Sequence, residues 1–93
     1  MAQVIVNGTV IAESDKVIND KGVIYFPHTA LKNAFFEESD THKLDPQKGV
    51  SNYYHINCNG KLIKDAAYYF PNPNPKSRPL QNFVAFTQGV KII

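Results

Sequence analysis

Residues 3–14 read QVIVNGTVIAES, and this stretch decides the fold class. Two runs rich in β-branched residues, at positions 4–6 and 9–11, flank the dipeptide Asn7-Gly8. Asn-Gly suits a type I′ turn, because both central residues of that turn have a positive φ. The chain is therefore predicted to open with a tight antiparallel hairpin.

A second hairpin is predicted directly after the first. The turn signal NDKG at residues 19–22 joins a short strand near residues 17–18 to the apolar strand VIYF at residues 23–26. Pro27 ends that strand, because proline has no N–H group for the hydrogen-bond ladder. Consecutive hairpins form a meander, which indicates an antiparallel architecture and not a βαβ one.

Residues 27–39 read PHTALKNAFFEES and predict one short helix. Thr29 suits the N-cap, and Leu31, Ala34 and Phe35 recur at the i, i+3, i+4 spacing of one helix face. We expect this helix to have about two turns and to lie across a sheet.

The sequence pattern in the middle of the chain changes at Lys48-Gly49, from a polar segment to an alternating one. Residues 37–49 are rich in charged side chains and read as a long polar connection. The sequence then alternates, and one strand face carries Val50, Tyr54, Ile56 and Cys58. On this face Cys58 is expected to be buried as a small hydrophobic residue. Asn59-Gly60 gives a second Asn-Gly turn.

The last third of the chain contains an aromatic strand and a proline-rich segment. Residues 66–80 read AAYYFPNPNPKSRPL, which predicts an apolar run followed by an extended loop. Residues 82–86 form a last core strand, and Gln88-Gly89 turns it into a short strand at residues 90–93. The chain as a whole is predicted to be mainly β, a single small domain (1–93) of coiled antiparallel sheets with one short helix.

Composition narrows the classes of partner and compartment. The chain has 93 residues, a net charge of +2 and one cysteine. Its ten basic residues are scattered, whereas a nucleic-acid interface gathers them on one face. A single cysteine allows no intramolecular disulfide. Because no signal-peptide pattern or bilayer-length apolar run is present, we expect a cytoplasmic protein without a membrane partner.

The densest group of chemically versatile side chains is in SDTHKLDPQKGVSNYYHI, residues 39–56. Asp40, His42 and Asp45 offer metal ligands within six residues. Zinc sites use more His or Cys, and a calcium loop has a denser run of acids, so the spacing matches neither. We expect no metal and no cofactor.

A small-molecule pocket fits these residues better. The chain has five tyrosines, and a tyrosine combines an apolar ring with a polar tip, which suits pocket walls. The expected lining residues are Glu13, Tyr25, Thr41, His42, Lys48, Tyr54 and Tyr69. Lys48 would neutralise an anionic group, Glu13 would accept hydrogen bonds and the tyrosines would form walls. The function expected from this set is non-catalytic binding of an anionic small molecule or a protein.

Two other functions stay open. A hydrolase or transferase would use His42 or His55 as general base and Lys48 as electrostatic stabiliser. Such an enzyme should place a histidine within hydrogen-bond reach of a hydroxyl or carboxylate inside a cleft. A homo-oligomer would instead pair through the exposed edge of a short strand such as residues 90–93.

Short segments along nearly the whole chain carry a family resemblance. They are NGTVIAESD (7–15), YFP (25–27), SDTH (39–42), PQKG (46–49) with YY (53–54), DAAYYFP (65–71) and VAF (84–86). In order and spacing the chain resembles the family called domain of unknown function 427, also labelled nucleotidyltransferase-like. The resemblance implies a single, mostly β domain with coiled, tent-like sheets. It implies no established activity and no catalytic residues.

The chain departs from the pattern of that family in one loop. The family pattern reads Cys-Pro-Trp-Lys-Gly where this chain has Asp45-Pro46-Gln47-Lys48-Gly49, so a thiol and an indole are replaced. Tryptophans of the pattern correspond here to Val6, Tyr68 and Thr87. A function that depends on that thiol or those indoles is therefore not transferred to this chain.

Overall fold

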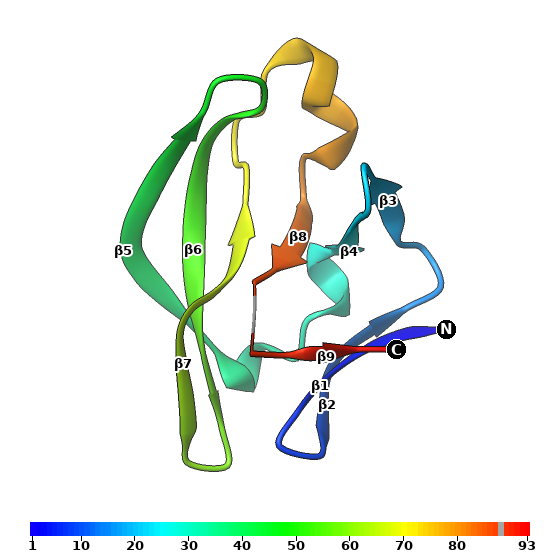
Figure 1. Cartoon of the computed structure of the whole chain (residues 1–93), viewed down its shortest axis with the longest axis vertical. Coiled ribbons are helices and arrows are strands. Elements are labelled where there is room, and N and C mark those ends of the chain that lie inside the picture. The colour runs from blue at the N-terminus through cyan, green and yellow to red at the C-terminus, as the bar shows by residue number, and fades with distance from the viewer. Residues whose placement is uncertain (88) are drawn as a thin grey trace.

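The computed structural model describes residues 1–87 and 89–93. In this part of the chain nine strands form two antiparallel sheets, which confirms the predicted mainly β class (Figure 1). The strands are β1 (Ala2–Val6), β2 (Thr9–Ser14), β3 (Ile18–Asp20), β4 (Val23–Pro27), β5 (Phe36–Asp45), β6 (Gly49–Cys58), β7 (Lys61–Tyr69), β8 (Phe83–Phe86) and β9 (Lys91–Ile92).

The main core joins the two sheets. The smaller sheet has the strand order β2-β1-β9 and the larger one the order β3-β4-β8-β7-β6-β5. In Figure 1 the long strands β5, β6 and β7 curve down one side, and β1, β2 and β9 cross the lower part of the other side. Val4 and Ile11 of the smaller sheet pack in one cluster with Phe26, Ile56 and Val84 of the larger, and all five are fully buried. Burying each such side chain contributes about 1.5–3 kcal/mol.

Both predicted Asn-Gly turns are confirmed. The φ angles are 51° and 77° in Asn7-Gly8 and 52° and 82° in Asn59-Gly60. Positive φ at both central residues defines the type I′ geometry that matches the twist of the flanking strands. Lys21-Gly22 has the same geometry, with φ angles of 53° and 85°. These three turns fix the register of the hairpins that they close.

The helical segment after β4 is divided into two 3-10 turns, η1 (His28–Ala30) and η2 (Asn33–Phe35). Leu31 lies between them in an extended conformation and forms a bridge to Ala12 of β2. The next residue, Lys32, donates its N–H to the carbonyl of Ile11 at 2.9 Å. These bonds to β2 satisfy backbone groups that a continuous helix would need for itself, so the helix is interrupted there.

The prediction of a polar connection over residues 37–49 is wrong for most of its length. Residues 37–45 belong to β5, which pairs antiparallel with β6. The prediction failed because β5 is the outer strand of the larger sheet. Charged side chains on an outer strand reach water and protect its unpaired edge, so the composition of an edge strand resembles that of a loop.

Two bulges flank the middle of β6. Residues 39–41 of β5 lie opposite the single residue Tyr53, and residues 64–66 of β7 lie opposite the single residue His55. Extra residues of this kind bend a strand and increase its local twist. The larger sheet is therefore bent on both sides of β6 at nearly the same level.

Burial along β6 changes phase at this bend. On the N-terminal side of the bend Ser51 and Tyr53 are buried, whereas on its C-terminal side Ile56 and Cys58 are buried. The expectation that Cys58 is buried is therefore confirmed. The predicted strand face is wrong at Val50, which is 48% exposed because it lies on the far side of the bend.

The proline-rich segment contains the 3-10 helix η3 (Pro75–Leu80), which differs from the extended loop that was predicted. Pro75 fits the first turn, where no intrahelical N–H bond is lost. Leu80 is buried and joins Tyr25, Phe70 and Ala85 in a second core cluster. The segment is thus folded against the larger sheet by its one buried leucine.

Asn74 fastens the β5–β6 turn to this segment. Its N–H donates to the carbonyl of Lys48 at 2.8 Å, and its side-chain amide donates to the carbonyl of Gln47 at 3.1 Å. Gly49 follows the turn with a φ of 112°, and a Cβ there would lie 3.2 Å from the carbonyl oxygen of Asn72. The turn and the proline-rich segment are therefore closely packed.

The terminal strand is confirmed as β9, which pairs with β1. The turn predicted at Gln88-Gly89 includes residue 88, which lies outside the described residues. Among the described residues, no helix combines the length and the apolar character needed to cross a membrane.

Gly49→Ala tests this packing. The substitution is expected to lower the free energy of unfolding by about 2–3 kcal/mol, because it combines an unfavourable φ with a close contact to Asn72. Gly60→Ala is the matched control, since it has a positive φ but no heavy atom within 4 Å of the added Cβ. It should cost about 1 kcal/mol. Equal losses in urea unfolding would contradict the close packing at Gly49.

Candidate functional site

Two Tyr-Tyr dipeptides, one in β6 and one in β7, place aromatic pairs on both faces of the larger sheet. Tyr53 and Tyr68 lie opposite each other in the ladder, with ring centroids 5.7 Å apart. Tyr54 and Tyr69 stack with ring centroids 5.0 Å apart. Because successive residues of a strand point to opposite faces, each dipeptide contributes one ring to each pair.

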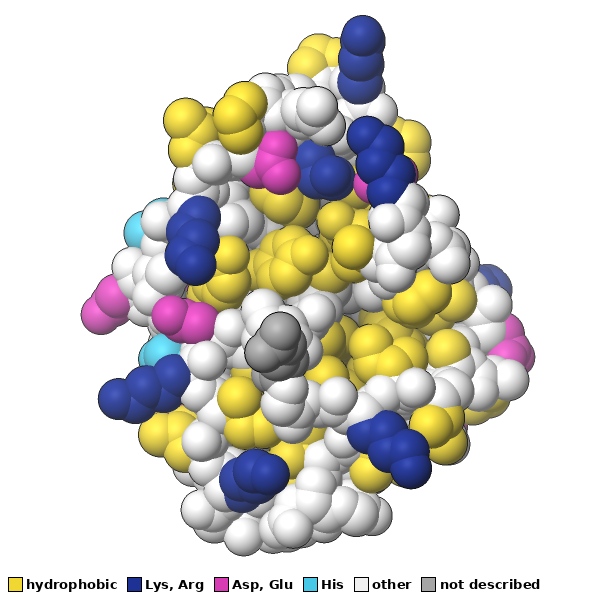
Figure 2. Space-filling model, viewed as in Figure 1, with side chains coloured by type: hydrophobic (Ala, Val, Ile, Leu, Met, Phe, Trp, Pro, Cys, Tyr) yellow, Lys and Arg dark blue, Asp and Glu magenta, His cyan; other side chains and the backbone are white. Residues whose placement is uncertain are grey.

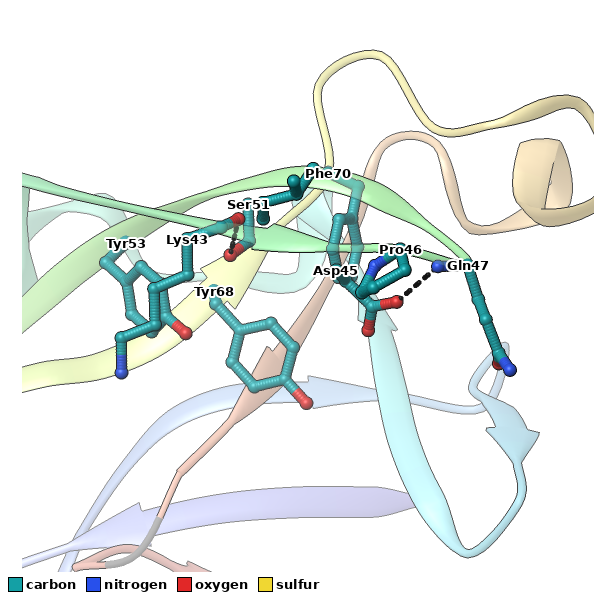
Figure 3. Close-up of a pocket in the computed structure, with 9 residues that line it drawn as sticks. Lys43, Asp45, Pro46, Gln47, Ser51, Tyr53, Tyr68 and Phe70 are labelled. Carbon is teal, nitrogen blue, oxygen red and sulfur yellow. Dashed lines mark hydrogen bonds between the residues drawn. The ribbon is translucent and has the colours of Figure 1, made fainter.

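The first pair forms one wall of a cavity that we call the aromatic hollow. Figure 3 shows the side chains of Tyr53 and Tyr68 projecting from the same side of their strands. The aromatic hollow has a volume of about 630 Å³ and is lined by Lys43, Leu44, Asp45, Pro46, Gln47, Ser51, Tyr53, Tyr68 and Phe70. In the space-filling view, hydrophobic side chains occupy the hollowed middle of the face, and lysine and arginine side chains surround them (Figure 2).

Tyr68, one ring of the wall, is backed by a buried tyrosine of the core. Tyr25 lies with Tyr68 in the adjoining core cluster. Burial is the main reason that the pKa values of both phenols are raised. The hydroxyl of Ser51, also on the lining, donates to the carbonyl of Lys43 at 3.1 Å. The wall therefore offers apolar rings together with a few satisfied polar groups.

Two charged side chains lie at the edge of the aromatic hollow. The Lys43 ammonium is 5.3 Å from the ring centroid of Tyr53, a cation–π distance. The Asp45 carboxylate accepts hydrogen bonds from the N–H groups of Gln47 (2.8 Å) and Lys48 (3.1 Å). These bonds, with that of Gln47 first, hold the pKa of Asp45 below its usual value. Asp45 thus acts as a turn-capping group.

A second cavity, the lysine hollow, lies on the other side of the β5–β6 turn. Its volume is about 740 Å³, and it is lined by Asp20, Lys21, Pro46, Gln47, Lys48, Asn74, Pro75, Lys76 and Ser77. The Lys48 ammonium is 3.8 Å from the nearer carboxylate oxygen of Asp20. The two hollows share Pro46 and Gln47, so they adjoin each other.

The second tyrosine pair belongs to a cluster on the opposite face of the sheet. Nε2 of His28 shares a hydrogen bond of 2.7 Å with the hydroxyl of Tyr54, and the His28 and Tyr69 ring centroids are 4.9 Å apart. The Tyr69 hydroxyl donates to the carboxylate of Glu38 at 3.2 Å. Burial lowers the pKa of His28, and the nearby charge of Glu38 opposes that shift. Burial also raises the pKa of Tyr54.

A carboxylate joins the two bulges beside β6. Asp65 accepts hydrogen bonds from the hydroxyls of Ser39 (2.5 Å) and Thr41 (2.8 Å). Its own N–H donates to Nδ1 of His55 at 3.0 Å. The hydroxyl bonds are the main reason that the pKa of Asp65 is lowered, and His55 and Lys43 add smaller contributions. Asp65 has a φ of 52°, so the bulge holds it in a left-handed conformation.

The two histidines expected as general bases are held by other groups. Nδ1 of His42, on the outer strand β5, lies 2.8 Å from the amide oxygen of Asn52 in β6. Nδ1 of His55 accepts the N–H of Asp65 at 3.0 Å. Neither histidine lines the aromatic or the lysine hollow, and Lys48 is beside Asp20.

The seven residues expected to bind a ligand lie in separate places. Tyr54 and Tyr69 are in contact with each other. Lys48 is six residues from Tyr54, which corresponds to about 20 Å of extended chain. Thr41 is bound to Asp65. The structure therefore does not bring Lys48 and the Tyr54–Tyr69 pair to one cavity.

The three remaining members of that set are also apart. Tyr25 is buried in the second core cluster, behind the aromatic hollow. Glu13 lies in β2 of the smaller sheet, opposite Gln3 of β1. His42 is exposed on β5. Binding by these residues stays a prediction.

Several residues around the hollows were not among the expected ones. The aromatic hollow is built mainly by Lys43, Tyr53, Tyr68 and Phe70. The two Tyr-Tyr dipeptides carried a usable signal, because antiparallel pairing must place one ring of each on either face. Nothing in the local pattern indicated His28 or Asp65, because their partners are 26 residues away in the sequence.

The residues expected to form an oligomer contact are on an open edge. β9 is an outer strand of the smaller sheet, and Ile92 and Ile93 are 38% and 58% exposed. Pairing of this edge with a second copy stays a prediction. Among the residues that the structure describes, no group of three or more His, Cys, Asp or Glu side chains is placed to hold a metal ion.

Fold and geometry together define a small antiparallel β domain with two adjoining surface hollows, one aromatic and one lysine-lined. Sequence comparison gives the family: the chain belongs to the family described as Domain of unknown function (DUF427), whose model matches residues 1–92. The resemblance seen in the sequence is thereby confirmed. No curated protein matches the chain.

Asp65→Asn is expected to lower the free energy of unfolding by about 1–2 kcal/mol at pH 7. The charged acceptor of two hydroxyl bonds is lost, and partial exposure of the side chain limits the effect. Because the pKa of Asp65 is lowered in the folded state, its contribution is present above about pH 4 and is lost at lower pH. Urea unfolding between pH 3 and 7 measures this. Asp40→Asn on the same bulge is the control, and an equal effect there would refute the assignment.

His28→Gln tests the cluster on the other face. Because burial lowers the pKa of His28, the unfolded chain binds a proton before the folded one as pH falls through about 6.5. The wild-type protein should therefore lose stability between pH 7.5 and 5.5, and His28→Gln should lose less. His42→Gln, at an exposed position, should keep the wild-type slope. If thermal unfolding showed the same change of stability with pH for the wild type and both variants, that result would argue against a buried neutral His28.

Proposed function

We propose that this domain is a non-catalytic binding module that holds a small anionic molecule with a flat apolar part. The observation that carries the proposal is the aromatic hollow, with Tyr53, Tyr68 and Phe70 on its wall and Lys43 at its edge. Ligand sites are typically concave, mostly apolar and furnished with a few placed polar groups. A cytoplasmic location is part of the proposal and is supported by Cys58, a buried free thiol.

The aromatic wall supplies affinity for a flat molecule. Tyr53 and Tyr68 present neighbouring rings with an interplanar angle of 35°, and Tyr68 meets Phe70 edge to face at a centroid distance of 6.0 Å. A ring or another flat group placed against Tyr68, the most exposed of the three rings, would bury apolar area and gain an aromatic contact of about 0.5–1.5 kcal/mol. Because Tyr53 and Phe70 are themselves well buried, little side-chain entropy would be lost on binding.

The charges around the aromatic hollow favour an anion. Lys43 lies at its edge, and the lysine hollow adjoins it across Pro46 and Gln47. The one carboxylate on its lining, Asp45, already accepts two backbone hydrogen bonds, which spread its charge over the turn. An anionic substituent would therefore meet Lys43 at the edge of the aromatic hollow, and the lysines of the lysine hollow lie beyond Pro46 and Gln47.

A rigid support favours binding without a large conformational change. The walls come from paired strands, and Asn74 ties the β5–β6 turn to the proline-rich segment with bonds to the carbonyls of Lys48 and Gln47. A preformed site of this kind needs little ordering when a ligand enters.

A fragment titration followed by two-dimensional NMR tests the proposal. A panel of flat aromatic carboxylates such as 1-naphthoate is expected to shift signals of Tyr53, Tyr68 and Phe70. Tyr68→Ala should weaken binding of the best fragment at least tenfold, or about 1.4 kcal/mol, because it removes one ring of the wall.

Tyr69→Ala is the matched control, because Tyr69 lies on the opposite face of the same strand. It should leave the affinity unchanged, and thermal unfolding verifies that both variants are folded. Lys43→Met should weaken the carboxylates more than their neutral analogues. Binding that falls with Tyr69→Ala and not with Tyr68→Ala, or a panel that leaves the aromatic hollow unshifted, would refute the proposal.

A further inference from the structure

We propose that the lysine hollow is a binding site for a phosphate group, the anionic half of a ligand whose flat half occupies the aromatic hollow. The proposal deepens the proposed function and rests on it for the link between the two halves. The phosphate site itself is argued from the turns β3–β4 and β5–β6 and from η3, which enclose the lysine hollow.

Lys48 provides the first argument, because its side chain is mostly buried while its ammonium has only a distant ionic partner. The side chain is only 17% exposed. Its ionic partner in the described part of the chain is Asp20, whose oxygen is 3.8 Å away and thus beyond hydrogen-bond distance. A lysine ammonium carries three N–H donors. An acceptor in the lysine hollow would therefore meet N–H donors for which the described residues provide no hydrogen bond.

Charge balance selects the class of anion. Lys21, Lys48 and Lys76 line the lysine hollow together with a single carboxylate, that of Asp20, which leaves a net charge of +2 on the lining. A phosphate monoester carries a charge of about −1.5 to −2 at pH 7 and offers three acceptor oxygens. Asn74 and Ser77 add polar groups to the same lining. A dianion with several acceptor oxygens matches this set better than a monocarboxylate.

The backbone holds these groups in place before a ligand arrives. Lys21 occupies the first central position of a type I′ turn with a φ of 53°, and Asn19 caps that turn by accepting the N–H of Gly22 at 3.0 Å. Lys48 is held through its carbonyl, which accepts the N–H of Asn74. Two tight turns thus direct their lysines to one cavity.

Continuity with the aromatic hollow supplies the last argument. Pro46 and Gln47 line both cavities and form the ridge between them. The charges of Lys48 and Lys21 also contribute to lowering the pKa of Asp45, which lines the aromatic hollow. Both ammonium groups therefore act across the ridge, and one molecule of moderate length can contact both sides.

Titration with inorganic phosphate tests the site without any flat group. Phosphate should shift the NMR signals of Lys21, Lys48, Asn74 and Lys76, and the shifts should weaken with added salt. In the double variant Lys48→Met and Lys76→Met the affinity for phosphate should fall at least tenfold. The matched control is Lys61→Met with Lys64→Met, which removes the same charge from β7 and should keep the wild-type affinity. Equal affinity in both double variants would overturn the phosphate site.

A second comparison separates the two proposals. 1-Naphthyl phosphate should bind the wild-type protein at least tenfold more tightly than 1-naphthol, and Lys48→Met with Lys76→Met should remove that difference while naphthol binding persists. Equal binding of both compounds by the wild type would overturn this inference and leave the aromatic hollow standing. Phosphate shifts in the lysine hollow with no naphthol binding would refute the proposed function and leave the phosphate site standing.

Discussion

The structure depends on one polar contact, in which the Asp65 carboxylate accepts the hydroxyls of Ser39 and Thr41 across β6. The contact joins a bulge of β5 to a bulge of β7, so it fixes where the larger sheet bends. On the N-terminal side of the bend, Tyr53 of β6 lines the aromatic hollow. On the C-terminal side, Ile56 of β6 packs in the main core. Tyr53 and Ile56 are three residues apart, so the two-residue period of a strand places them on opposite faces, and β6 contributes to both the aromatic hollow and the main core.

The β5–β6 turn gives this bent sheet its chemical character. The turn carries Asp45, Pro46, Gln47 and Lys48, and Asn74 anchors it to the proline-rich segment. It separates an aromatic cavity from a lysine-lined one, and both are supported by paired strands or tight turns. The family pattern has a cysteine and a tryptophan in this turn. This chain has Asp45 and Gln47 at those two positions. The site of this chain therefore rests on tyrosines and lysines.

Local patterns predicted the parts of the fold that depend on local chemistry. The Asn-Gly turns, the strands around them and the buried Cys58 follow from φ preferences and alternation, and the structure confirms them. Local patterns failed where a partner distant in the sequence decides the local structure. β5 looks like a loop because its charges face water, and the helix after β4 is interrupted because Leu31 pairs with Ala12 of β2. Lys48, Tyr54 and Tyr69 were expected to line one cavity. About six residues of extended chain separate Lys48 from Tyr54, so the structure does not bring them together.

The most direct test of this account is a double-mutant cycle between Ser39→Ala and Asp65→Asn, with the free energy of unfolding measured at pH 7. If the carboxylate–hydroxyl contact fixes the bend, the two substitutions must be strongly non-additive, with a coupling energy of about 1 kcal/mol or more. The NMR signals of Tyr53 and Tyr68 should shift in each single variant, because the bend orients their rings. Additive losses together with unchanged tyrosine signals would show that the bend has another cause.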